Sequence, residues 1–217
     1  MAQKELNTGI YGILPADIDT NLLLEKAEAA LAGGVKTLQL RDKKNGFKRK
    51  LKRATALREL TLKYQAMLII NDSKQLALGC GADGVHLGKD DTTNLMYIRK
   101  DVSDDFIVGI TARADAQYAK AAISHGANYV SFGAVFESQT KADVPVIGLP
   151  RLTKACSMFP NTPICAIGGI SMDNIVMIKA AGASYAAVIS SLFDGTAVEI
   201  QNNATNMVTL WNSAPSA

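Results

Sequence analysis

Short apolar runs recur along the whole chain, and each is followed by a stretch whose apolar residues return at helical spacing. The runs are too short for helices and lack polar alternation, which is typical of parallel strands buried on both faces. Predicted strands cover residues 10–14, 35–40, 67–70, 84–87, 106–110, 129–133 and 185–189, and another begins the run 163–171. Predicted helices cover residues 22–31, 47–64, 73–78, 115–125, 150–159, 173–181 and 197–211, with one more starting after a cap at 91–93. The pattern predicts an α/β protein of eight alternating strands and helices.

A glycine that ends a helix precedes every second predicted strand. These glycines are Gly34, Gly81, Gly126 and Gly182, and successive ones are about two strand–helix units apart. This repeat favours a closed (β/α)8 TIM barrel over a doubly wound open sheet, which would normally carry a glycine-rich turn after its first strand. Residues 15–17 form no such turn. We therefore expect one barrel domain over residues 1–217.

The predicted seventh and eighth strands both end in residues suited to binding an anion. The first of them runs into Gly168 and Gly169, and the second ends at Ser190. Glycines allow backbone N–H groups to approach an anion closely, and the amino end of a following helix adds positive potential. Barrels of this kind commonly bind phosphate after strands seven and eight. The sequence thus predicts a phosphate site there.

Composition and charge narrow the class of protein. The chain has 217 residues, of which 48% are hydrophobic and 20% charged, as is ordinary for a globular domain. The net charge of +3 is mild, and the basic run 43–58 is interpreted as a solvated helix face rather than a nucleic-acid surface. Three cysteines without C-x-x-C spacing indicate neither a disulfide framework nor a zinc site. With no apolar stretch long enough for a signal peptide or a membrane span, we expect a cytoplasmic protein with no nucleic-acid or membrane partner. Assembly into a homo-oligomer is compatible with the sequence.

Polar and charged residues follow the predicted strands, and in a barrel the carboxyl ends of all strands share one face. The residues at these ends are Arg41, Lys43, Asn71, Asp72, Lys89, Asp91, Thr111, Ser138, Thr140, Lys141, Gly169 and Ser190. Asp72 and Asp91 supply the hard oxygen ligands that Mg²⁺ prefers, and the basic residues would neutralise a diphosphate on the same ion. Taken singly, Asp91 is as well explained as a helix cap, Asp72 as a turn residue and Lys141 as a solvated loop charge. Their joint position favours one site for anions and a metal.

Histidine and cysteine are not assigned a catalytic role. His86 lies within a mostly apolar strand and is expected to be a hydrogen-bonded core residue, whereas His125 is expected to interact with the carboxyl end of a helix. Cys165, inside the seventh strand, is interpreted as a small buried hydrophobe.

The motifs, taken in order, resemble those of the thiamine-phosphate synthase family over residues 11–193. The matching segments are 39–43, 70–72, 82–88 with Asp91, 140–141, 166–170 and 189–190. The resemblance implies a Mg²⁺-dependent transferase that joins 4-amino-2-methyl-5-hydroxymethylpyrimidine diphosphate to 4-methyl-5-(2-phosphoethyl)thiazole and releases diphosphate and thiamine phosphate. Its partners would be these two small-molecule substrates.

The resemblance also implies roles for individual residues. Substrate-binding residues would be Gln39, Leu40, Arg41, Asp42, Lys43, Asn71, Thr111, Ser138, Gln139, Thr140, Lys141, Gly169, Ile189 and Ser190. Catalytic groups among them would be Arg41, Lys43, Thr111 and Lys141, with Mg²⁺ on Asp72 and Asp91. The chain departs from the family pattern at Lys89, Thr111, Arg113, Ala134 and Ser138, where glutamine, serine, histidine, proline and threonine are common. Lys89 and Arg113 add charge near the expected diphosphate.

Two other functions are compatible with such a barrel. One is a relative that binds thiazole phosphate and acts as a tautomerase or in regulation, without the metal and diphosphate groups. The other is a non-enzymatic protein that binds a phosphorylated metabolite and has lost the carboxylates at the strand ends. Retention of Arg41, Lys43, Asp72, Asp91 and Lys141 argues against both.

Overall fold

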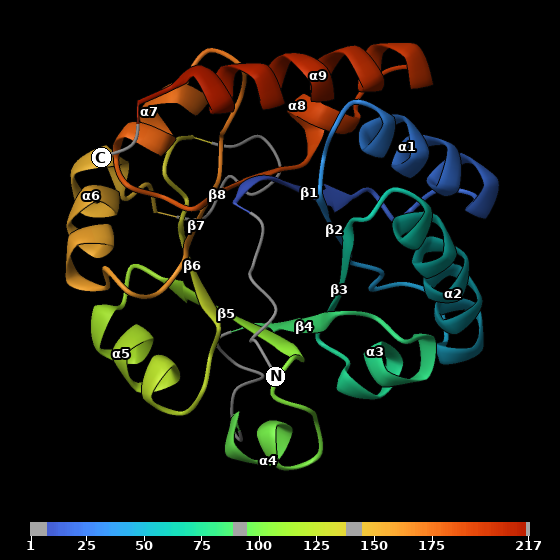
Figure 1. The fold of residues 1–217 in the computed structure, drawn as a ribbon, viewed down its shortest axis with the longest axis horizontal. Helices are drawn as coiled ribbons and strands as arrows, with labels where there is room; N and C mark the ends of the chain where they lie inside the picture. The colour runs from blue at the N-terminus through green and yellow to red at the C-terminus, as the bar shows by residue number, and fades with distance from the viewer. Residues whose placement is uncertain (1–7, 89–94, 138–144, 216–217) are drawn as a thin grey trace.

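Eight parallel strands close into a barrel, and helices surround it (Figure 1). The computed structural model describes residues 8–88, 95–137 and 145–215. The strands are β1 (Gly9–Leu14), β2 (Thr37–Leu40), β3 (Met67–Asn71), β4 (Gly84–Leu87), β5 (Ile107–Arg113), β6 (Tyr129–Gly133), β7 (Ile164–Ile167) and β8 (Tyr185–Val188). Each strand pairs with its neighbours in sequence, and β1 pairs with β8, so the predicted TIM barrel is confirmed.

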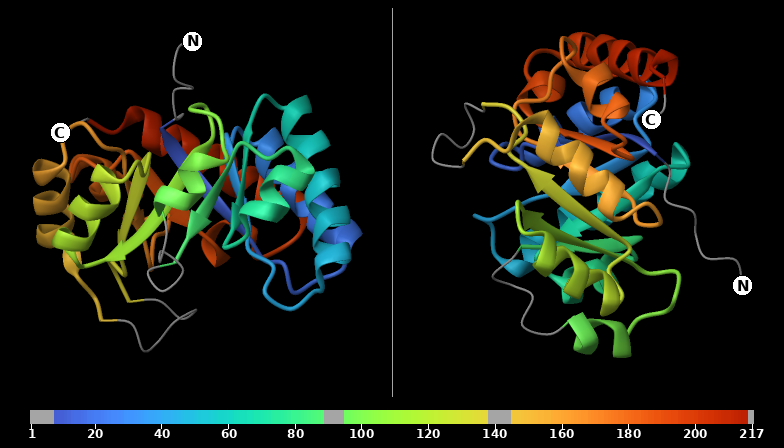
Figure 2. Two further views of the ribbon diagram at one scale, coloured as in Figure 1. Left: turned by 90° about the horizontal axis from the view of Figure 1, so that it is seen from below. Right: turned by 90° about the vertical axis from the view of Figure 1, so that its left-hand side faces the viewer.

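The helices lie outside the ring of strands, as the side views also show (Figure 2). They are α1 (Thr20–Ala32), α2 (Phe47–Lys63), α3 (Lys74–Cys80), α4 (Leu95–Lys100), α5 (Ala116–Ser124), α6 (Gly148–Met158), α7 (Ile175–Ala180), α8 (Ser190–Phe193) and α9 (Ala197–Ser213). Side chains cap several amino ends: Asp19 accepts a hydrogen bond from Asn21 N, and Ser73 accepts one from Leu76 N. These caps confirm helix starts that the sequence predicts.

The strands are buried on both faces, as their apolar sequences predict. Outward-facing residues such as Leu38, Leu68 and Val130 belong to a large cluster shared with the helices. Inward-facing residues such as Ile69 and Tyr129 form a second, smaller cluster inside the barrel. The alternation of the two sets follows from the two-residue period of a strand.

Some element boundaries differ from the prediction. Strand β2 begins at Thr37 rather than at residue 35, because the Val35 N–H instead donates to Ala30 O and closes the end of α1. Helix α7 begins at Ile175 rather than 173, because the residues before it form a turn. In this turn the Asn174 side chain accepts a hydrogen bond from Ser171 N and donates one to Gly169 O. The four-residue helix α8 is absent from the prediction, since so short a segment has no helical period. The predicted cap at 91–93 lies outside the described residues.

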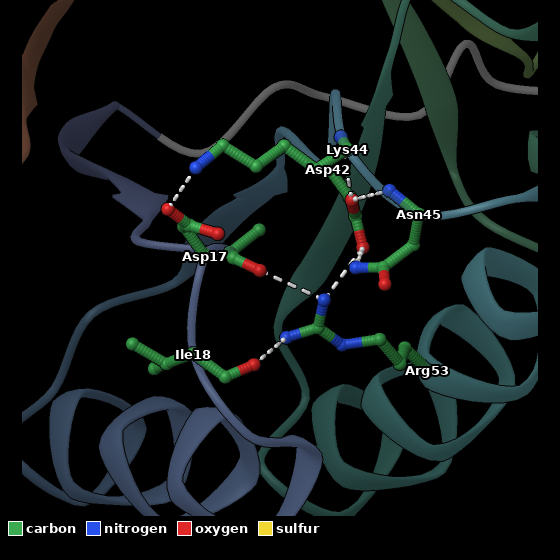
Figure 3. Close-up of polar contacts among 7 residues, drawn as sticks. Asp17, Ile18, Asp42, Lys44, Asn45 and Arg53 are labelled. Atoms are coloured by element: carbon green, nitrogen blue, oxygen red, sulfur yellow. Dashed lines mark hydrogen bonds and ion pairs between the residues drawn. The ribbon is translucent and has the colours of Figure 1, made fainter.

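The solvated-face interpretation of the basic run 43–58 is wrong at Arg53, which is fully buried in α2. Its guanidinium donates to Asp42 Oδ2 at 2.6 Å, to Ala16 O at 2.8 Å and to Ile18 O at 3.0 Å (Figure 3). Burial alone would raise the pKa of Asp42, but hydrogen bonds from Asn45 and Arg53 more than offset it and hold that pKa below its usual range. Arg53 thus ties the loops after β1 and β2 to the helix layer.

We expect Arg53→Met to lower the free energy of unfolding by about 3–5 kcal/mol, because it leaves the buried Asp42 carboxylate without its cation. Lys52→Met, at an exposed position of the same helix, is the matched control and should change it by less than about 0.5 kcal/mol. Urea unfolding of both variants measures the difference. Equal stability of the two variants would show that the ion pair does not hold these loops.

Candidate active site

The carboxyl ends of the strands gather the predicted site residues that the structure describes. Arg41 follows β2, Asn71 ends β3, Thr111 lies near the end of β5, Gly169 follows β7, and Ser190 follows β8. Because all the strands are parallel, these residues lie at one end of the barrel. The predicted residues Asp91, Ser138, Gln139, Thr140 and Lys141, together with Lys89, lie outside the described residues.

A pocket of about 270 Å³ opens between the ends of β2 and β3. Its lining combines basic, acidic and polar side chains with two leucines: Leu40, Asp42, Lys43, Lys50, Asn71, Asp72, Ser73 and Leu76. A larger cavity of about 540 Å³ lies at the opposite end, beside the amino ends of β1 and β2 and next to Trp211. That cavity contains no predicted site residue and no acidic residue, so its greater volume does not make it the better candidate. The concentration of charged groups assigns the candidate site to the smaller pocket.

Lys50 is a pocket residue that the sequence analysis did not identify. It occupies the first turn of α2, and the sequence analysis placed it within the solvated basic run. A signal was available, since the amino ends of barrel helices lie on the same side as the carboxyl ends of the strands that precede them. Lys50 is therefore a second cationic side chain at this pocket, in addition to Lys43.

Asp72 adopts a backbone conformation that few residues other than glycine tolerate. Its φ is +65°, in the left-handed region where aspartate and asparagine are favoured over other side chains. The Asp72 N–H donates to His86 O at 2.8 Å, which fixes the end of β3 against β4. Its carboxylate is one-third exposed and lies 3.4 Å from Lys43 Nζ. An accessible carboxylate at this position fits a hard divalent cation, although no three His, Cys, Asp or Glu side chains in the described part of the chain converge on one point.

The segment 39–43 does not present all its side chains to the site. Gln39 faces the barrel interior and donates from Nε2 to Tyr11 Oη at 2.9 Å, whereas Leu40 lines the pocket and is buried in the cluster shared with the helices. Asp42 accepts hydrogen bonds from the backbone N–H groups of Lys44 and Asn45 as well as from Arg53. The Asp42 side chain thus holds the loop together. Arg41 and Lys43 are the two residues of the segment 39–43 that remain as cationic groups for the site.

The turn after β7 depends on its two glycines. Gly168 and Gly169 have φ values of +101° and +64°. A Cβ on Gly169 would lie 2.2 Å from Glu137 O, so a side chain there would collide with the backbone that follows β6. Asn174 Nδ2 donates to Gly169 O at 2.9 Å and fixes the turn from the other side. This glycine turn and the start of α8 at Ser190 form the region where a phosphate site is predicted.

Inside the barrel, a chain of hydrogen bonds links residues that the sequence analysis did not connect. Tyr11 Oη lies 2.9 Å from Tyr129 Oη, and His86 joins Tyr129 through Nδ1 at 2.8 Å and Thr111 through Nε2 at 2.9 Å. The prediction that His86 is a hydrogen-bonded core residue is confirmed. Burial lowers its pKa to about 4, so the imidazole is neutral near pH 7.

The interpretations of Cys165 and His125 also agree with the structure. Cys165 is buried inside the barrel, and burial raises the pKa of its thiol. At the end of α5, the His125 Nδ1 atom lies 2.6 Å from Ala121 O, as expected for a residue that satisfies a helix terminus.

Comparison with known proteins identifies relatives. The family model described as thiamine monophosphate synthase matches residues 10–192. The thiamine-phosphate synthase of Methylobacillus flagellatus is 41% identical over 204 residues, covering 94% of this chain and 95% of the relative, and that of Thioalkalivibrio sulfidiphilus is 42% identical, covering 85% and 87%. The solved thiamine phosphate pyrophosphorylase from Pyrococcus furiosus superposes with a TM-score of 0.84 at 27% identity, covering 96% of this chain and 97% of that structure.

The buried neutral imidazole predicts a specific pH dependence of stability. Because the pKa of His86 is about 4 when folded and near 6.5 when unfolded, the unfolded state binds the extra proton between these values. The free energy of unfolding should therefore fall as the pH is lowered from 7 to 4.5, with roughly 2–3 kcal/mol of the loss due to His86. Urea unfolding of His86→Gln should lack that part of the slope, and His125→Gln should keep it. The same slope in wild type and His86→Gln would contradict this assignment.

Proposed function

The chain belongs to the thiamine monophosphate synthase family, and from that premise we propose that it joins 4-amino-2-methyl-5-hydroxymethylpyrimidine diphosphate to 4-methyl-5-(2-phosphoethyl)thiazole. The bond between the pyrimidine methylene carbon and the diphosphate oxygen breaks, and diphosphate leaves with the electron pair. The thiazole nitrogen donates its lone pair to the same carbon, giving thiamine phosphate. The observation that carries the proposal is the clustering of Lys43, Lys50, Asn71 and Asp72 around one pocket at the carboxyl end of the barrel.

The main task of the protein in this reaction is to stabilise the leaving diphosphate. An aminopyrimidine is electron-rich and stabilises positive charge on its methylene carbon, so charge separates as the carbon–oxygen bond breaks. Arg41 and Lys43 follow β2, where cations can bind the diphosphate before reaction, and Thr111 adds a hydroxyl from β5. The reaction needs no strong base, which agrees with a buried His86 whose lowered pKa leaves it neutral.

The thiazole substrate would be held by its phosphate on the other side of the same face. Gly169, Ile189 and Ser190 supply backbone groups after β7 and β8, and the first N–H groups of a helix have no partner within it. Ser138 and Thr140 would complete this site. Anchoring the phosphate turns an encounter of two substrates into an oriented reaction.

Mg²⁺ is the cation that this proposal assigns to Asp72 and Asp91, and when bound it would neutralise negative charge on the diphosphate oxygens. Asp72 supports the assignment because its carboxylate is accessible at the pocket and has a cationic neighbour in Lys43. Lys43, beside this carboxylate, would contact the diphosphate directly.

The proposed activity is tested by incubating the protein with both substrates and Mg²⁺ and measuring thiamine phosphate and diphosphate by chromatography. We expect equal amounts of the two products, and neither when one substrate is omitted. No thiamine phosphate from a folded protein with both substrates present would overturn the proposal.

We expect Asp72→Asn to lower kcat by roughly two orders of magnitude, as is typical for loss of one electrostatic stabiliser. Asparagine tolerates the left-handed backbone of this position, so the variant removes charge without adding strain. Binding of thiazole phosphate should be unchanged. Asp105→Asn, at an exposed position before β5, is the control and should have wild-type kinetics. A full rate for Asp72→Asn would remove this residue from the metal site.

Lys141 is expected to act in the transition state, when negative charge accumulates on the departing diphosphate. Lys141→Ala should lower kcat by roughly two orders of magnitude, with a smaller change in affinity for pyrimidine diphosphate. Arg41→Ala should raise KM as well, because Arg41 follows a fixed strand and contacts the bound substrate. Lys154→Ala, at an exposed position of α6, is the control. Steady-state kinetics decide: near-wild-type rates in both lysine variants would show that Lys141 is only a solvated loop residue.

A further inference from the structure

A row of polar side chains crosses the inside of the barrel from β2 to the end of β5. It runs from Gln39 through Tyr11, Tyr129 and His86 to Thr111, with successive donor and acceptor atoms 2.8–2.9 Å apart. The first four side chains are buried, and Thr111 is half-buried at the carboxyl end of the barrel. The row therefore connects the barrel interior to the face where the substrates are proposed to bind.

The direction of these hydrogen bonds follows from counting protons. The Gln39 amide nitrogen can only donate, so Tyr11 accepts from it and has one proton of its own to place. If Tyr11 donates to Tyr129, then Tyr129 can donate to His86 Nδ1, and every proton has an acceptor. If His86 Nδ1–H instead donated to Tyr129, then Tyr129 would donate to Tyr11. The Tyr11 proton would then be buried without an acceptor among the described residues, which is costly.

This direction fixes the state of the last two residues. With Nδ1 accepting from Tyr129, the neutral imidazole carries its proton on Nε2 and donates it to Thr111 Oγ1. Thr111 then accepts from His86, and the structure records no acceptor for its own proton within the described part of the chain. That proton is available to a ligand at the carboxyl face.

We propose that His86 is a positioning residue that makes Thr111 a hydrogen-bond donor toward an acceptor oxygen of the pyrimidine diphosphate. The proposal rests on the proposed function for the identity of that ligand. The row of hydrogen bonds favours a ligand that presents an acceptor at Thr111, because the hydroxyl proton is then the group that Thr111 has left to place. His86 itself does not touch the substrate.

Packing fixes the positions of the Tyr129 and His86 rings in this row. A Cβ on Gly109 would lie 2.0 Å from Tyr129 Cζ and 2.3 Å from its hydroxyl oxygen, so only glycine leaves room for this ring on the neighbouring strand. The His86 and Tyr129 rings stack with centroids 5.5 Å apart, which fixes the plane of the imidazole. Tyr185 lies in the same interior cluster, but its buried hydroxyl has no hydrogen-bond partner among the residues that the structure describes. Tyr185 therefore provides an internal control for Tyr129.

The tautomer can be measured without any activity. Nitrogen-15 NMR of the histidine side chains should show His86 as a neutral imidazole protonated on Nε2 at pH 7, and His125→Gln assigns the signals, since the chain has two histidines. Tyr129→Phe should loosen this preference, and Tyr185→Phe should leave it unchanged. An Nδ1-protonated or charged His86 would overturn the proposal, whatever the substrate proves to be.

Kinetics of variants test the link to the substrate. His86→Leu should lower kcat/KM by about tenfold to a hundredfold, the range for losing one hydrogen bond to a charged group. His86→Gln, which places an amide donor near the position of Nε2, should recover most of the loss. Tyr129→Phe should show a smaller decrease, and Tyr185→Phe should stay within about twofold of wild type. Melting temperatures near that of wild type confirm that each variant is folded.

A double-variant cycle separates positioning from a merely structural role. Because His86 acts through Thr111, the loss in Thr111→Val/His86→Leu should equal the loss in Thr111→Val alone. Losses that multiply, or equal losses in His86→Leu and His86→Gln, would overturn the positioning role. Failure of the proposed function would appear differently, as no thiamine phosphate from the wild-type protein, and would leave the NMR result intact.

Discussion

Closure of eight parallel strands is the constraint on which the rest of this structure depends. It directs every strand's carboxyl end to one side, so residues as distant in sequence as Arg41 and Ser190 lie on a single face. It also buries both faces of each strand and divides the apolar residues into an interior cluster and a cluster shared with the helices. A chemistry that needs two anionic substrates at one point can therefore use residues from many strands without a second domain.

Two networks of buried polar residues lie within this closed architecture. Asp42 and Arg53 are both buried, and their opposite charges form an ion pair. With this carboxylate, the carbonyl oxygens of Ala16 and Ile18 hold the guanidinium between the loops after β1 and β2. Inside the barrel, His86 and two tyrosines satisfy one another in the same way. Each of these groups would be expensive to bury alone, so the two networks specify the geometry of the loops and strand ends as well as stabilising them.

The sequence alone predicts the features that depend on local pattern. Apolar runs give the eight strands, Asp19 and Ser73 mark helix starts, and glycines mark the turn after β7. The common face follows from the barrel, and the family follows from motifs such as 39–43. What the sequence does not predict depends on long-range register: the burial of Arg53 against Asp42, the meeting of His86 with Tyr129 across two strands, and the turn of α2 that brings Lys50 to the pocket. No local pattern encodes those distances, because each depends on how two separate elements pack.

The central claim is that the carboxyl end of the barrel binds both substrates, although the larger cavity lies at the other end beside Trp211. Titration of nitrogen-15-labelled protein with the thiazole phosphate, followed through the NMR signals of the backbone amides and of the indole N–H, tests it most directly. We expect the Gly169 and Ser190 amide signals to shift with saturable dependence on ligand, while the signal of the single tryptophan, Trp211, stays in place. Shifts at Gly9 and Trp211 without shifts at Gly169 and Ser190 would contradict the account.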